Sequence, residues 1–482
     1  MAEGGQPRYL LHCAPFFVYQ APPVTDSAFS TLPLSLAMVA NLDSLGYTGM
    51  TPIQAKSLPV ILEGADLIAQ AKTGSGKTAA FGIGLLNPLN PRYFGCQALV
   101  LCPTRELADQ VAKEIRRLAR GEDNIKVLTL CGGVPTGPQR ASLEHGAQII
   151  VGTPGRVQEH LSRETLNLDG LNTLVLDEAD RMLDMGFYDS IAEIIGKAPA
   201  RRQTLLFSAT YPSGIKKLAA SFMREPKMIR VEALHDDSQI EQRFYEIDPD
   251  ERLEAVVSLL ACYRPESAVA FCFTKQQCQE VADYLSARGI SAMALNGDLE
   301  QRDRDQVLAM FANRSLSVLV ATDVAARGLD IDALDMVINV ELARDSETHI
   351  HRVGRTGRAG KKGMAMSLVA PPEMRRAQAI EDLQKTPLNW HPLKSLKPQA
   401  GDPLQPPMST LCIAAGRKDK LRPGDILGAL TGEAGIPAAQ VGKITIFDFQ
   451  AFVAVERGIA SQAMKRLSDG KIKGRSLRVR IL

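Results

Sequence analysis

Residues 71–78 have the sequence AKTGSGKT, and this stretch decides the fold expected for the first part of the chain. An apolar run, Leu67–Ala69, precedes it, and a run compatible with a helix, Ala79–Ile83, follows it. In such a turn from strand to helix, backbone N–H groups and the helix dipole bind phosphate, while lysine adds a charge and a hydroxyl ligates Mg²⁺. A Gly/Ser-rich surface turn is the alternative, because the usual pattern begins with glycine and this stretch begins with alanine. The Gly-Lys-Thr triplet after a strand favours the phosphate loop, whose predicted members are Ala71, Lys72, Thr73, Gly74, Ser75, Gly76, Lys77 and Thr78.

Short apolar runs alternate with amphipathic segments on both sides of a polar interruption. Continuous apolar strands between helices are typical of a parallel sheet that helices cover on both faces. We therefore expect two tandem α/β domains, at 26–231 and 243–385, joined by a linker at 232–242. The expected strands lie at residues 98–101, 127–130, 149–151, 174–176, 204–207, 268–273, 291–295, 318–321 and 336–340.

Two segments follow the second domain. Residues 386–407 contain six prolines, which is typical of a semi-rigid tether. Residues 408–482 show strand and helix patterns in the order βαββαβ, which predicts a small α+β domain like an RNA-recognition sheet. This last segment has 13 Lys and Arg against 6 Asp and Glu, whereas the rest of the chain has 43 against 48. Such an appendage favours binding of a polyanion, and a solvated basic face is the alternative.

Composition also favours a cytoplasmic protein. The eight cysteines include no Cys-x-x-Cys pair, and several lie in apolar runs, so we expect them to be reduced. No stretch approaches the roughly 20 apolar residues of a membrane span, so no membrane partner is expected. Residues 1–25 hold two short apolar runs, interrupted by His12 and Pro15, without a clear cleavage site. We expect a poorly ordered extension there rather than a signal peptide.

A second constellation, Asp177-Glu178-Ala179-Asp180, directly follows the apolar run at 173–176. An acidic pair at a strand end beside a phosphate loop can hold Mg²⁺ through Asp177, with Glu178 placed to orient and deprotonate an attacking water. The alternative is a helix N-terminus that is merely enriched in acidic residues. Its position after a strand favours a hydrolytic site in which Thr78 and Asp177, the latter through water, hold the metal.

The string Asp-Glu-Ala-Asp together with the phosphate loop resembles the DEAD-box RNA helicase family, and the resemblance covers nearly all of residues 29–370. It implies two RecA-like domains, ATP as substrate, Mg²⁺ as cofactor, and alanine as the family's residue at position 71. Phe29 and the stretch 46–54 resemble the family's adenine-reading motif. This implies that Gln54 bonds the adenine edge through its amide and that Phe29 packs over that contact.

Three loops of the first domain are similar to the family's contacts with the RNA backbone. Phosphate and sugar contacts of this kind position a strand without reading its sequence. The implied RNA-binding residues are Pro103, Thr104, Arg105, Gly132, Gly133, Thr153, Pro154, Gly155 and Arg156. Ser208 and Thr210 are implied to couple the ATP state to the RNA state through Asp180. Ser and Thr after a strand are also common helix caps, and that alternative stays open.

The second domain carries the family's complementary motifs. The resemblance implies RNA contacts for Gln301, Arg304 and Thr322 and a ribose contact for Asp330.

A cationic cluster lies further along the second domain. Arg355 and Arg358 are implied to reach the γ-phosphate as arginine fingers, and His351 to pair with Asp180. A solvated basic helix face is the alternative for this cluster. The residues expected to take part in catalysis are Lys77, Asp177, Glu178, Arg355 and Arg358.

The C-terminal segment lacks aromatic residues where an RNA-recognition domain stacks bases. Cys412 and Gln450 occupy two of those positions, and only Phe452 remains. We therefore expect RNA contacts at edges and loops, where the basic residues are Arg417, Lys418, Lys420, Arg422, Lys465, Arg466, Lys471, Lys473, Arg475, Arg478 and Arg480. A degenerate domain of this kind behind a DEAD-box core resembles the bacterial DbpA-type helicases. It implies anchoring to a hairpin of 23S rRNA during assembly of the 50S subunit.

The division of the motifs between two domains implies a mechanism. ATP on the first domain draws in the arginines of the second, and closure completes the RNA-binding surface. The expected activity is an RNA-dependent ATPase and non-processive helicase that acts as a monomer. Two alternatives stay open: an ATP-clamped RNA-binding scaffold with little unwinding, and an RNA-independent or DNA-directed ATPase. The latter fits the phosphate loop but poorly explains Gln54, Arg355 and Arg358.

Overall fold

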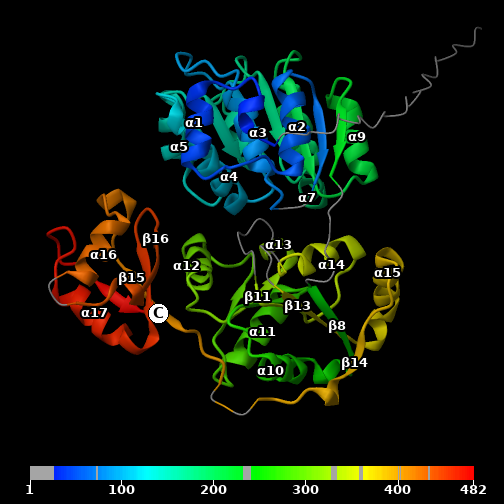
Figure 1. Cartoon of the computed structure of the whole chain (residues 1–482), viewed down its shortest axis with the longest axis vertical. Helices are drawn as coiled ribbons and strands as arrows, with labels where there is room; N and C mark the ends of the chain where they lie inside the picture. Colours follow the sequence, from blue (N-terminus) through cyan, green and yellow to red (C-terminus); the bar gives the residue numbers. More distant parts are fainter. Residues whose placement is uncertain are drawn as a thin grey trace, which may run out of the picture. The chain divides into compact units, whose positions relative to one another are not determined.

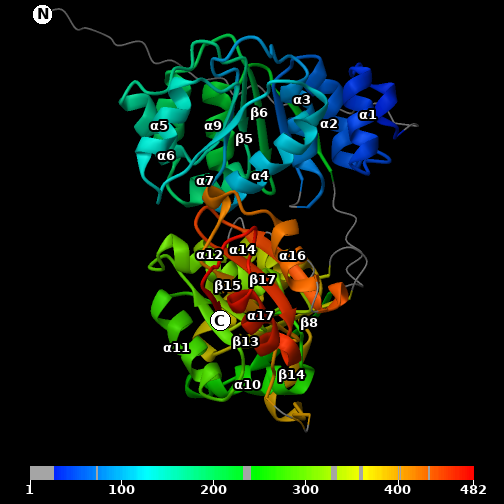
Figure 2. The same ribbon diagram turned by 90° about the vertical axis from the view of Figure 1, so that its left-hand side faces the viewer.

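The computed structural model describes residues 27–71, 74–231, 240–326, 334–357, 362–399, 401, 403–432 and 435–482 (Figures 1 and 2). These residues form two compact units, one before and one after residues 232–239. The extension expected at 1–25 lies outside them. Within the described ranges, no helix combines the length and the apolar character needed to cross a membrane.

Domain 1, the first unit, is a parallel sheet of seven strands in the order β3-β4-β2-β5-β6-β1-β7. Its strands are β1 (Leu67–Gln70), β2 (Ala98–Leu101), β3 (Val127–Leu130), β4 (Ile149–Gly152), β5 (Thr173–Leu176), β6 (Gln203–Ser208) and β7 (Lys227–Arg230). Its helices are α1 (Leu36–Ser44), α2 (Pro52–Leu62), α3 (Lys77–Leu86), α4 (Arg105–Leu118), α5 (Thr136–Glu144), α6 (Pro154–Ser162), α7 (Ala179–Asp184), α8 (Tyr188–Gly196) and α9 (Ser213–Phe222).

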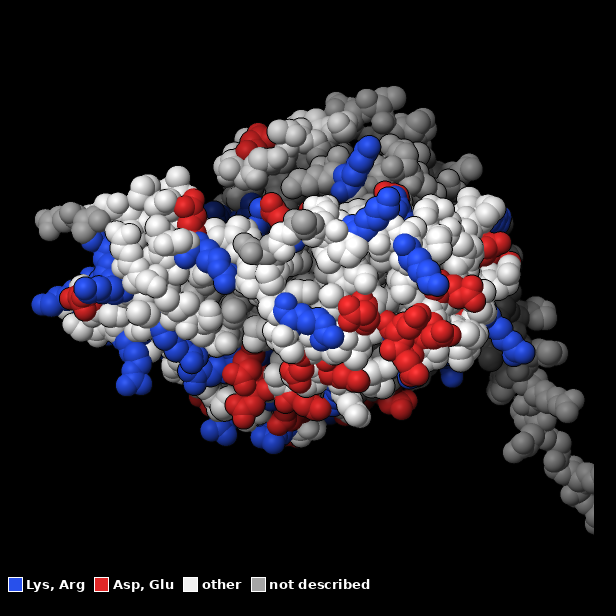
Figure 3. Space-filling model, turned by 90° about the horizontal axis from the view of Figure 1, so that it is seen from below, with Lys and Arg blue, Asp and Glu red and all other residues white. Residues whose placement is uncertain are grey.

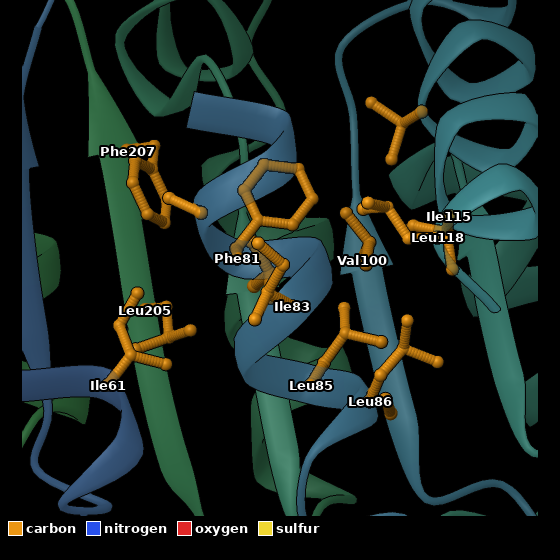
Figure 4. Close-up of a cluster of buried hydrophobic side chains, with 14 of the residues drawn as sticks. Ile61, Phe81, Ile83, Leu85, Leu86, Val100, Ile115, Leu118, Leu205 and Phe207 are labelled. Carbon is orange, nitrogen blue, oxygen red and sulfur yellow. The ribbon is translucent and has the colours of Figure 1, made fainter. Parts of the chain in front are cut away.

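Helix α3, which follows the phosphate loop, is packed tightly on three sides (Figure 4). Phe81 meets Phe207 of β6 with ring centroids 5.3 Å apart, and both rings are fully buried. A Cβ at Gly84 would lie 2.2 Å from Ile61 Cγ2 of α2, so only glycine allows this approach. Burial of each large apolar side chain here contributes about 1.5–3 kcal/mol. The start of α3, where phosphate is expected to bind, is therefore held by a rigid core.

Domain 2 begins the second unit and has a parallel sheet of the order β10-β11-β9-β12-β13-β8-β14. Its strands are β8 (Ile240–Glu246), β9 (Ala268–Cys272), β10 (Ala292–Leu295), β11 (Val318–Thr322), β12 (Met336–Asn339), β13 (Gly363–Val369) and β14 (Trp390–Pro392). Its helices are α10 (Arg252–Tyr263), α11 (Lys275–Ser286), α12 (Gln301–Ala312), α13 (Asp323–Ala326), α14 (Ser346–Val353) and α15 (Met374–Gln384). The expected parallel α/β architecture of both domains is confirmed.

The two segments expected to be linkers contribute strands to domain 2. Residues 240–242, which polarity assigned to the linker, pair with β13 as the start of β8. Residues 390–392 of the proline-rich tether form β14, which pairs with β8 at the sheet edge. Proline is tolerated there because an edge strand needs hydrogen bonds on one side only. Trp390 packs on Phe244 of β8 with ring centroids 5.7 Å apart, so the first half of the tether is anchored.

The C-terminal domain, residues 408–482, has the expected βαββαβ order. Its antiparallel sheet runs β16-β17-β15-β18. The elements are β15 (Met408–Ile413), α16 (Pro423–Thr431), β16 (Val441–Ile446), β17 (Ala451–Glu456), α17 (Ala460–Asp469) and β18 (Val479–Ile481). Alternation along the strands gives the sheet two apolar faces. One face packs on α16 and α17 and forms the domain's own core.

The other face of this sheet packs on helix α12 of domain 2. Phe452 of β17 and Cys412 of β15 meet Ala309 in one buried cluster. Asn313 Nδ2 donates to Thr410 Oγ1 at 2.8 Å, and that hydroxyl donates back to Asn313 Oδ1 at 3.2 Å. In Figures 1 and 2 the helices α16 and α17 accordingly lie on the side of the sheet away from domain 2. The face on which an RNA-recognition sheet stacks bases is therefore covered by protein.

Candidate functional site

The carboxyl ends of three adjacent strands of domain 1 bring together the expected ATP-binding and coupling motifs. Strands β5, β6 and β1 are neighbours, and they lead into residues 177–180, 208–210 and 71–78, respectively. In a parallel sheet such ends form the usual ligand-binding edge. Motifs separated by more than one hundred residues are thus assembled at one place. Lys72 and Thr73 lie outside the described residues.

The phosphate loop ends on Gly76, which has φ +93° and precedes α3. A Cβ there would lie 2.6 Å from Gln54 Nε2, so the position requires glycine for its backbone angle and for space. Lys77 is buried, and its Nζ donates to the carbonyl of Ala71 at 3.0 Å. The ammonium group of Lys77 therefore lies beside the first residue of the loop that is expected to bind phosphate. Thr78 is half-buried in the first turn of α3, and Gly74 and Ser75 form the turn before it.

The adenine-reading motif is joined to this loop by hydrogen bonds. Gln54 Nε2 donates to the carbonyl of Gly76 at 3.1 Å, and its Oε1 accepts from Thr51 N at 2.8 Å. Thr51 Oγ1 donates to the carbonyl of Ser75 at 2.8 Å. An amide has two donor hydrogens and two acceptor lone pairs, so one of each remains for the edge of a base. Phe29 is buried and packs edge-on against Tyr47 with ring centroids 6.1 Å apart.

Two buried carboxylates follow β5. Burial raises the pKa of Asp177 to about 6, and the nearby positive charge of Lys77 acts in the opposite direction. Glu178 adopts the left-handed conformation with φ 52° and ψ 51°, which is uncommon for a residue with a side chain. Its carboxylate meets Arg181 Nη1 at 2.9 Å, and both side chains are more than 90 % buried. A left-handed backbone at a residue with a side chain is strained. It persists only where the surrounding structure stabilises it, and such positions are concentrated at functional sites.

Asp180 binds the residues that follow β6. Its Oδ2 accepts hydrogen bonds from the backbone N–H groups of Ala209 and Thr210 at 3.1 and 2.9 Å and from Thr210 Oγ1 at 3.0 Å. The N–H of Asp180 donates to Ser208 Oγ at 3.3 Å. The carboxylate of the box and the Ser-Ala-Thr segment therefore form one network. The Ser208 hydroxyl accepts from an N–H in the first turn of α7, so the helix-cap alternative stays open beside the predicted coupling role.

The residues at this edge suit a magnesium ion bound together with phosphate. Mg²⁺ usually keeps several waters and takes one or two carboxylates plus substrate phosphates, rather than a cage of protein ligands. Among the described residues no cluster of three or more His, Cys, Asp and Glu side chains could form such a cage. The Thr78 hydroxyl and the Asp177 carboxylate would hold the ion, which supplies positive charge beside the transferred phosphate. The raised pKa of Asp177 reflects a buried carboxylate that a nearby cation would keep ionised.

Three further strands of the same edge carry the expected RNA contacts of domain 1. Strands β3, β4 and β2 are neighbours, and they lead into residues 132–133, 153–156 and 103–105. Thr104 caps α4, Gly133 has φ +73° and lies against the Arg105 guanidinium, and Pro154 begins α6. Arg156 donates to the carbonyl of Val134 at 3.0 Å. The ATP and RNA motifs thus occupy two halves of one sheet edge.

In domain 2 the expected RNA contacts gather where β10 and β11 end. Gln301 is the first residue of α12, and its Nε2 donates to Asp305 Oδ1 at 2.7 Å. Thr322 ends β11, and its hydroxyl accepts from the N–H of Ala325 at 3.3 Å. Arg304 Nη2 donates to the carbonyl of Ala325 at 2.8 Å. The Arg304 bond joins the start of α12 to α13, which directly follows β11. Asp330 lies outside the described residues.

Helix α14 and the turn after it hold the cationic cluster. Arg352 is almost fully buried, and its guanidinium binds both carboxylate oxygens of Asp323, at 2.6 and 2.8 Å. It also lies 5.0 Å from the centre of the Phe271 ring. Arg355, just beyond the helix, is buried as well, and His351 is half-buried. The cluster is therefore not a solvated basic face. Arg358 lies outside the described residues.

A buried histidine on the same helix gives a testable pH dependence. Burial, reinforced by Arg352, lowers the pKa of His349 to about 4. Because the folded state binds fewer protons than the unfolded state between about pH 4 and 6.5, the free energy of unfolding should rise with pH across this window. We expect His349 to account for about 2 kcal/mol between pH 5 and 7.5.

The single tryptophan permits this measurement. Trp390 and His349 both pack on Phe244, so Trp390 fluorescence during urea unfolding reports on this part of domain 2. His349→Phe removes the titrating group and keeps an aromatic ring. The difference in unfolding free energy between pH 5 and 7.5 should shrink by about 2 kcal/mol in this variant. An unchanged pH dependence would contradict the buried neutral imidazole.

Three family models match consecutive parts of the chain. The DEAD/DEAH box helicase model matches residues 51–218, the helicase conserved C-terminal domain 251–360, and the DbpA RNA binding domain 410–481. The ATP-dependent RNA helicase DbpA of Escherichia coli (strain K12) is 54% identical over 457 residues, which cover 95% of this chain and all of that protein. The chain belongs to the DEAD-box ATP-dependent RNA helicases. The helicase is also 44% identical to DEAD-box ATP-dependent RNA helicase CshA of Bacillus subtilis (strain 168), over 74% of this chain and 72% of that protein.

Solved structures agree with the RecA-like assignment of both domains. Dbp5 of S. cerevisiae bound to RNA and ADP BeF3 superposes with a TM-score of 0.70 at 28% identity, covering 77% of the helicase and 96% of that chain. Mss116p bound to ssRNA and AMP-PNP gives 0.69 at 25% identity, covering 78% and 81%. The expected fold of two RecA-like domains followed by a small α+β domain is confirmed. The helicase depends on ATP and binds RNA.

Sequence reasoning missed several residues that support the site. Arg181, which pairs with Glu178, directly follows the acidic box, and Asp323, which clamps Arg352, directly follows Thr322, but neither residue was given a role. Thr51 joins the adenine motif to the phosphate loop. The Thr-x-x-Gln spacing of Thr51 and Gln54 is that of a capping box, and it could have indicated the bond between them. The i,i+3 spacing of Glu178 and Arg181 could also have indicated their ion pair. The bond between Arg352 and Asp323 depends on how the sheet places distant segments, and no local pattern shows it.

Proposed function

We propose that this helicase remodels RNA locally and without processive movement, and that its substrate is 23S rRNA in intermediates of 50S subunit assembly. The shared sheet edge of domain 1 carries the proposal, because ATP motifs and RNA motifs occupy its two halves and β5, which leads to Asp180, pairs with β2, which leads to residues 103–105. A change in the ATP half can thus be transmitted to the RNA half through packed strands. The basic C-terminal domain supports the choice of a structured RNA.

In the proposed cycle, domain 1 binds ATP and domain 2 completes the site. Lys77 and the loop backbone hold the phosphates, Gln54 and Phe29 hold the adenine, and Asp330 holds the ribose. Glu178 takes the proton of the attacking water. The implied fingers, Arg355 and Arg358, neutralise the charge that develops on the phosphoryl group, and His351 meets Asp180 on closure.

Closure also forms one RNA-binding surface from both domains. The strand would lie along residues 103–105, 132–133 and 153–156 of domain 1 and along Gln301, Arg304 and Thr322 of domain 2. Contacts of this kind grip phosphates and sugars, so a bent strand is held whatever its sequence. Base pairs then separate because a bent strand cannot stay in a continuous A-form duplex. We further propose that the helicase works in the cytoplasm and as a monomer.

The decisive experiment measures ATP hydrolysis by the full-length protein with a panel of RNAs. Hairpins from 23S rRNA should stimulate hydrolysis at far lower concentrations than poly(A). Equal stimulation by all RNAs would contradict the proposed substrate, and hydrolysis that is independent of RNA would contradict the proposed cycle. Displacement of a short strand from a duplex joined to the preferred hairpin separates a helicase from an ATP-clamped scaffold.

The preference for hairpins should depend on exposed basic residues of the C-terminal domain. Lys418 and Arg422 are exposed beside the start of α16. The double variant Lys418→Glu/Arg422→Glu should lose the preference for 23S hairpins and retain stimulation by poly(A), because each phosphate contact adds binding that depends on charge. The affinity for hairpin RNA that the variant retains should also depend less on salt concentration, because fewer phosphates are contacted. A variant with the charge changes Lys216→Glu/Lys217→Glu on α9 of domain 1 controls for net charge.

This pair of charge changes is preferable to removal of residues 408–482. Truncation would also remove hairpin preference, but it would uncover Ala309 and Asn313 on α12, which are buried against the domain. An effect of truncation on hydrolysis could therefore come from an exposed apolar face. A double variant that still prefers 23S hairpins would contradict the role given to this basic surface.

A further inference from the structure

An exposed phenylalanine lies in the hairpin turn between β16 and β17 of the C-terminal domain. Phe449 is 75% exposed, more than any other aromatic residue that the structure describes. Its neighbour in the turn, Phe447, packs edge-on against Phe452 at 5.6 Å and belongs to the interface with α12. Phe449 belongs to no apolar cluster of the described residues. Folding of the domain therefore does not account for this ring.

The turn chemistry does not require a phenylalanine either. Phe447 N donates to the carbonyl of Gln450 at 2.8 Å, so residues 448 and 449 form a two-residue loop. Neither loop residue has a positive φ, and turns of this kind accept most residue types. An aromatic ring at the second loop position forgoes the stabilisation that burial would give it.

The backbone that carries this ring is held in place from two sides. Arg417 N and Lys418 N donate to the carbonyls of Phe447 and Asp448 at 2.7 and 2.9 Å. On the other side, Gln450 is buried, and its Oε1 accepts from Arg302 Nε of α12 at 3.2 Å. A loop with these three attachments presents its exposed ring in a defined position, which lowers the entropy lost on binding.

Charge around the ring favours a nucleic acid. Arg417 and Lys418 are exposed directly beside the turn, and Arg417 lies 3.7 Å from the carboxylate of Asp448. Figure 3 shows Lys and Arg side chains gathered over the C-terminal domain, at the left, whereas Asp and Glu gather over domain 2. Aromatic rings beside cationic side chains are the usual platform for single-stranded nucleic acid, where bases stack and phosphates meet the charges.

The position of the ring connects it with the RNA contacts of domain 2. Arg302, to which Gln450 bonds, lies between Gln301 and Arg304 in the first turn of α12. Phe449 directly precedes Gln450, so the Cα atoms of the two residues lie about 3.8 Å apart. A strand that leaves the start of α12 towards the C-terminal domain would meet this ring.

We propose that Phe449 stacks on an unpaired base of the RNA, between the strand gripped by domain 2 and the hairpin bound by the C-terminal domain. This inference rests on the proposed function, because it takes Gln301 and Arg304 as RNA contacts. The covered sheet face makes a ring outside the sheet necessary, since Phe452 and Cys412 are buried against α12. The expected ligand is a single-stranded nucleotide of any sequence, because every base has a face that can stack.

The test uses the full-length helicase and a 23S hairpin RNA that carries a short single-stranded extension. Phe449→Ala should weaken binding roughly fivefold to one hundredfold, the range that aromatic stacking on a base gives. Phe449→Leu should weaken it as much, because it keeps apolar area but no flat ring. Phe449→Tyr should bind as the wild type does. Leu427→Ala, at a partly exposed apolar residue on α16, is the matched control and should have no effect.

A spectroscopic measurement tests the contact itself. The chain has one tryptophan, so Trp390→Phe/Phe449→Trp places the only indole in the turn. Its fluorescence should be quenched when the RNA binds, and replacement of the stacked nucleotide by an abasic one should abolish the quenching. If Phe449→Ala binds as the wild type does, or if the indole is not quenched, the stacking proposal is overturned. If the wild type itself shows no response to hairpin RNA, the proposed function fails as well, and the two failures are thereby distinguished.

Discussion

Glu178→Gln should reduce RNA-stimulated ATP hydrolysis about 10²–10⁴-fold while ATP binding is retained. The substitution removes the carboxylate that is proposed to take the proton of the attacking water. The amide oxygen of glutamine can still accept from Arg181, which lies 2.9 Å from Glu178 and is equally buried. The buried guanidinium thus keeps a partner, and the fold of domain 1 should be preserved.

A second measurement on the same variant tests the mechanism. Because hydrolysis reopens the domains in the proposed cycle, the variant should accumulate a long-lived complex with ATP and RNA. Dissociation of labelled RNA should be slow with ATP and fast with ADP. Glu193→Gln on α8, a half-exposed residue 3.5 Å from Lys197, is the matched control and should hydrolyse ATP normally. Substantial hydrolysis by Glu178→Gln would remove this residue from the role of general base.

Arg355→Gln should lower the rate of hydrolysis about 10³–10⁵-fold, as loss of an arginine finger does in other phosphoryl transfers. The change shortens the side chain, keeps a polar amide, and removes the charge and the guanidinium fork. Since Arg355 belongs to domain 2 and the phosphate loop to domain 1, affinity for ATP should change little. Single-turnover hydrolysis and binding of a fluorescent ATP analogue separate the two effects.

The control for this substitution is Arg375→Gln, at an exposed residue of α15. It removes one positive charge from the same domain and should leave hydrolysis unchanged. Equal loss of ATP binding and hydrolysis in Arg355→Gln would instead indicate a structural role, which the burial of Arg355 makes the main alternative. Arg355→Lys separates them further, because it restores the charge without the fork.

The sequence predicted the sheets well because their strands are continuous apolar runs. Residues 98–101 and 127–130 were expected as strands and are strands with those bounds. The sequence did not predict the strand in the proline-rich segment, because β14 has only three residues and one of them is a proline. An edge strand of this kind is decided by the partner strand β8, which lies about 150 residues earlier, and local composition does not contain that information.

The site shows the same division between local and distant causes. The loop at 71–78 and the acids at 177–180 have local signatures, because phosphate binding needs particular residue types at particular spacings. The bond between Asp180 and Thr210 and the bond of Arg352 to Asp323 arise only when the folded sheet brings segments after different strands together. The reason for the missing aromatic residues in the C-terminal sheet was likewise not visible in the sequence. Cys412 and Phe452 belong to an interface with α12.

Helix α12 therefore limits how freely the C-terminal domain can be exchanged between helicases. One end of the helix carries Gln301 and Arg304, and its flank carries Ala309 and Asn313, which pack on the sheet. A chimaera that receives residues 408–482 alone would gain the basic surface but would lack the residues of domain 2 on which this domain packs. To keep the orientation of the C-terminal domain, a chimaera must also receive the side of α12 that contacts the sheet. The domain and this side of α12 should therefore be transferred together. Engineered helicases with altered RNA targets should be cut upstream of this helix, not at the proline-rich segment.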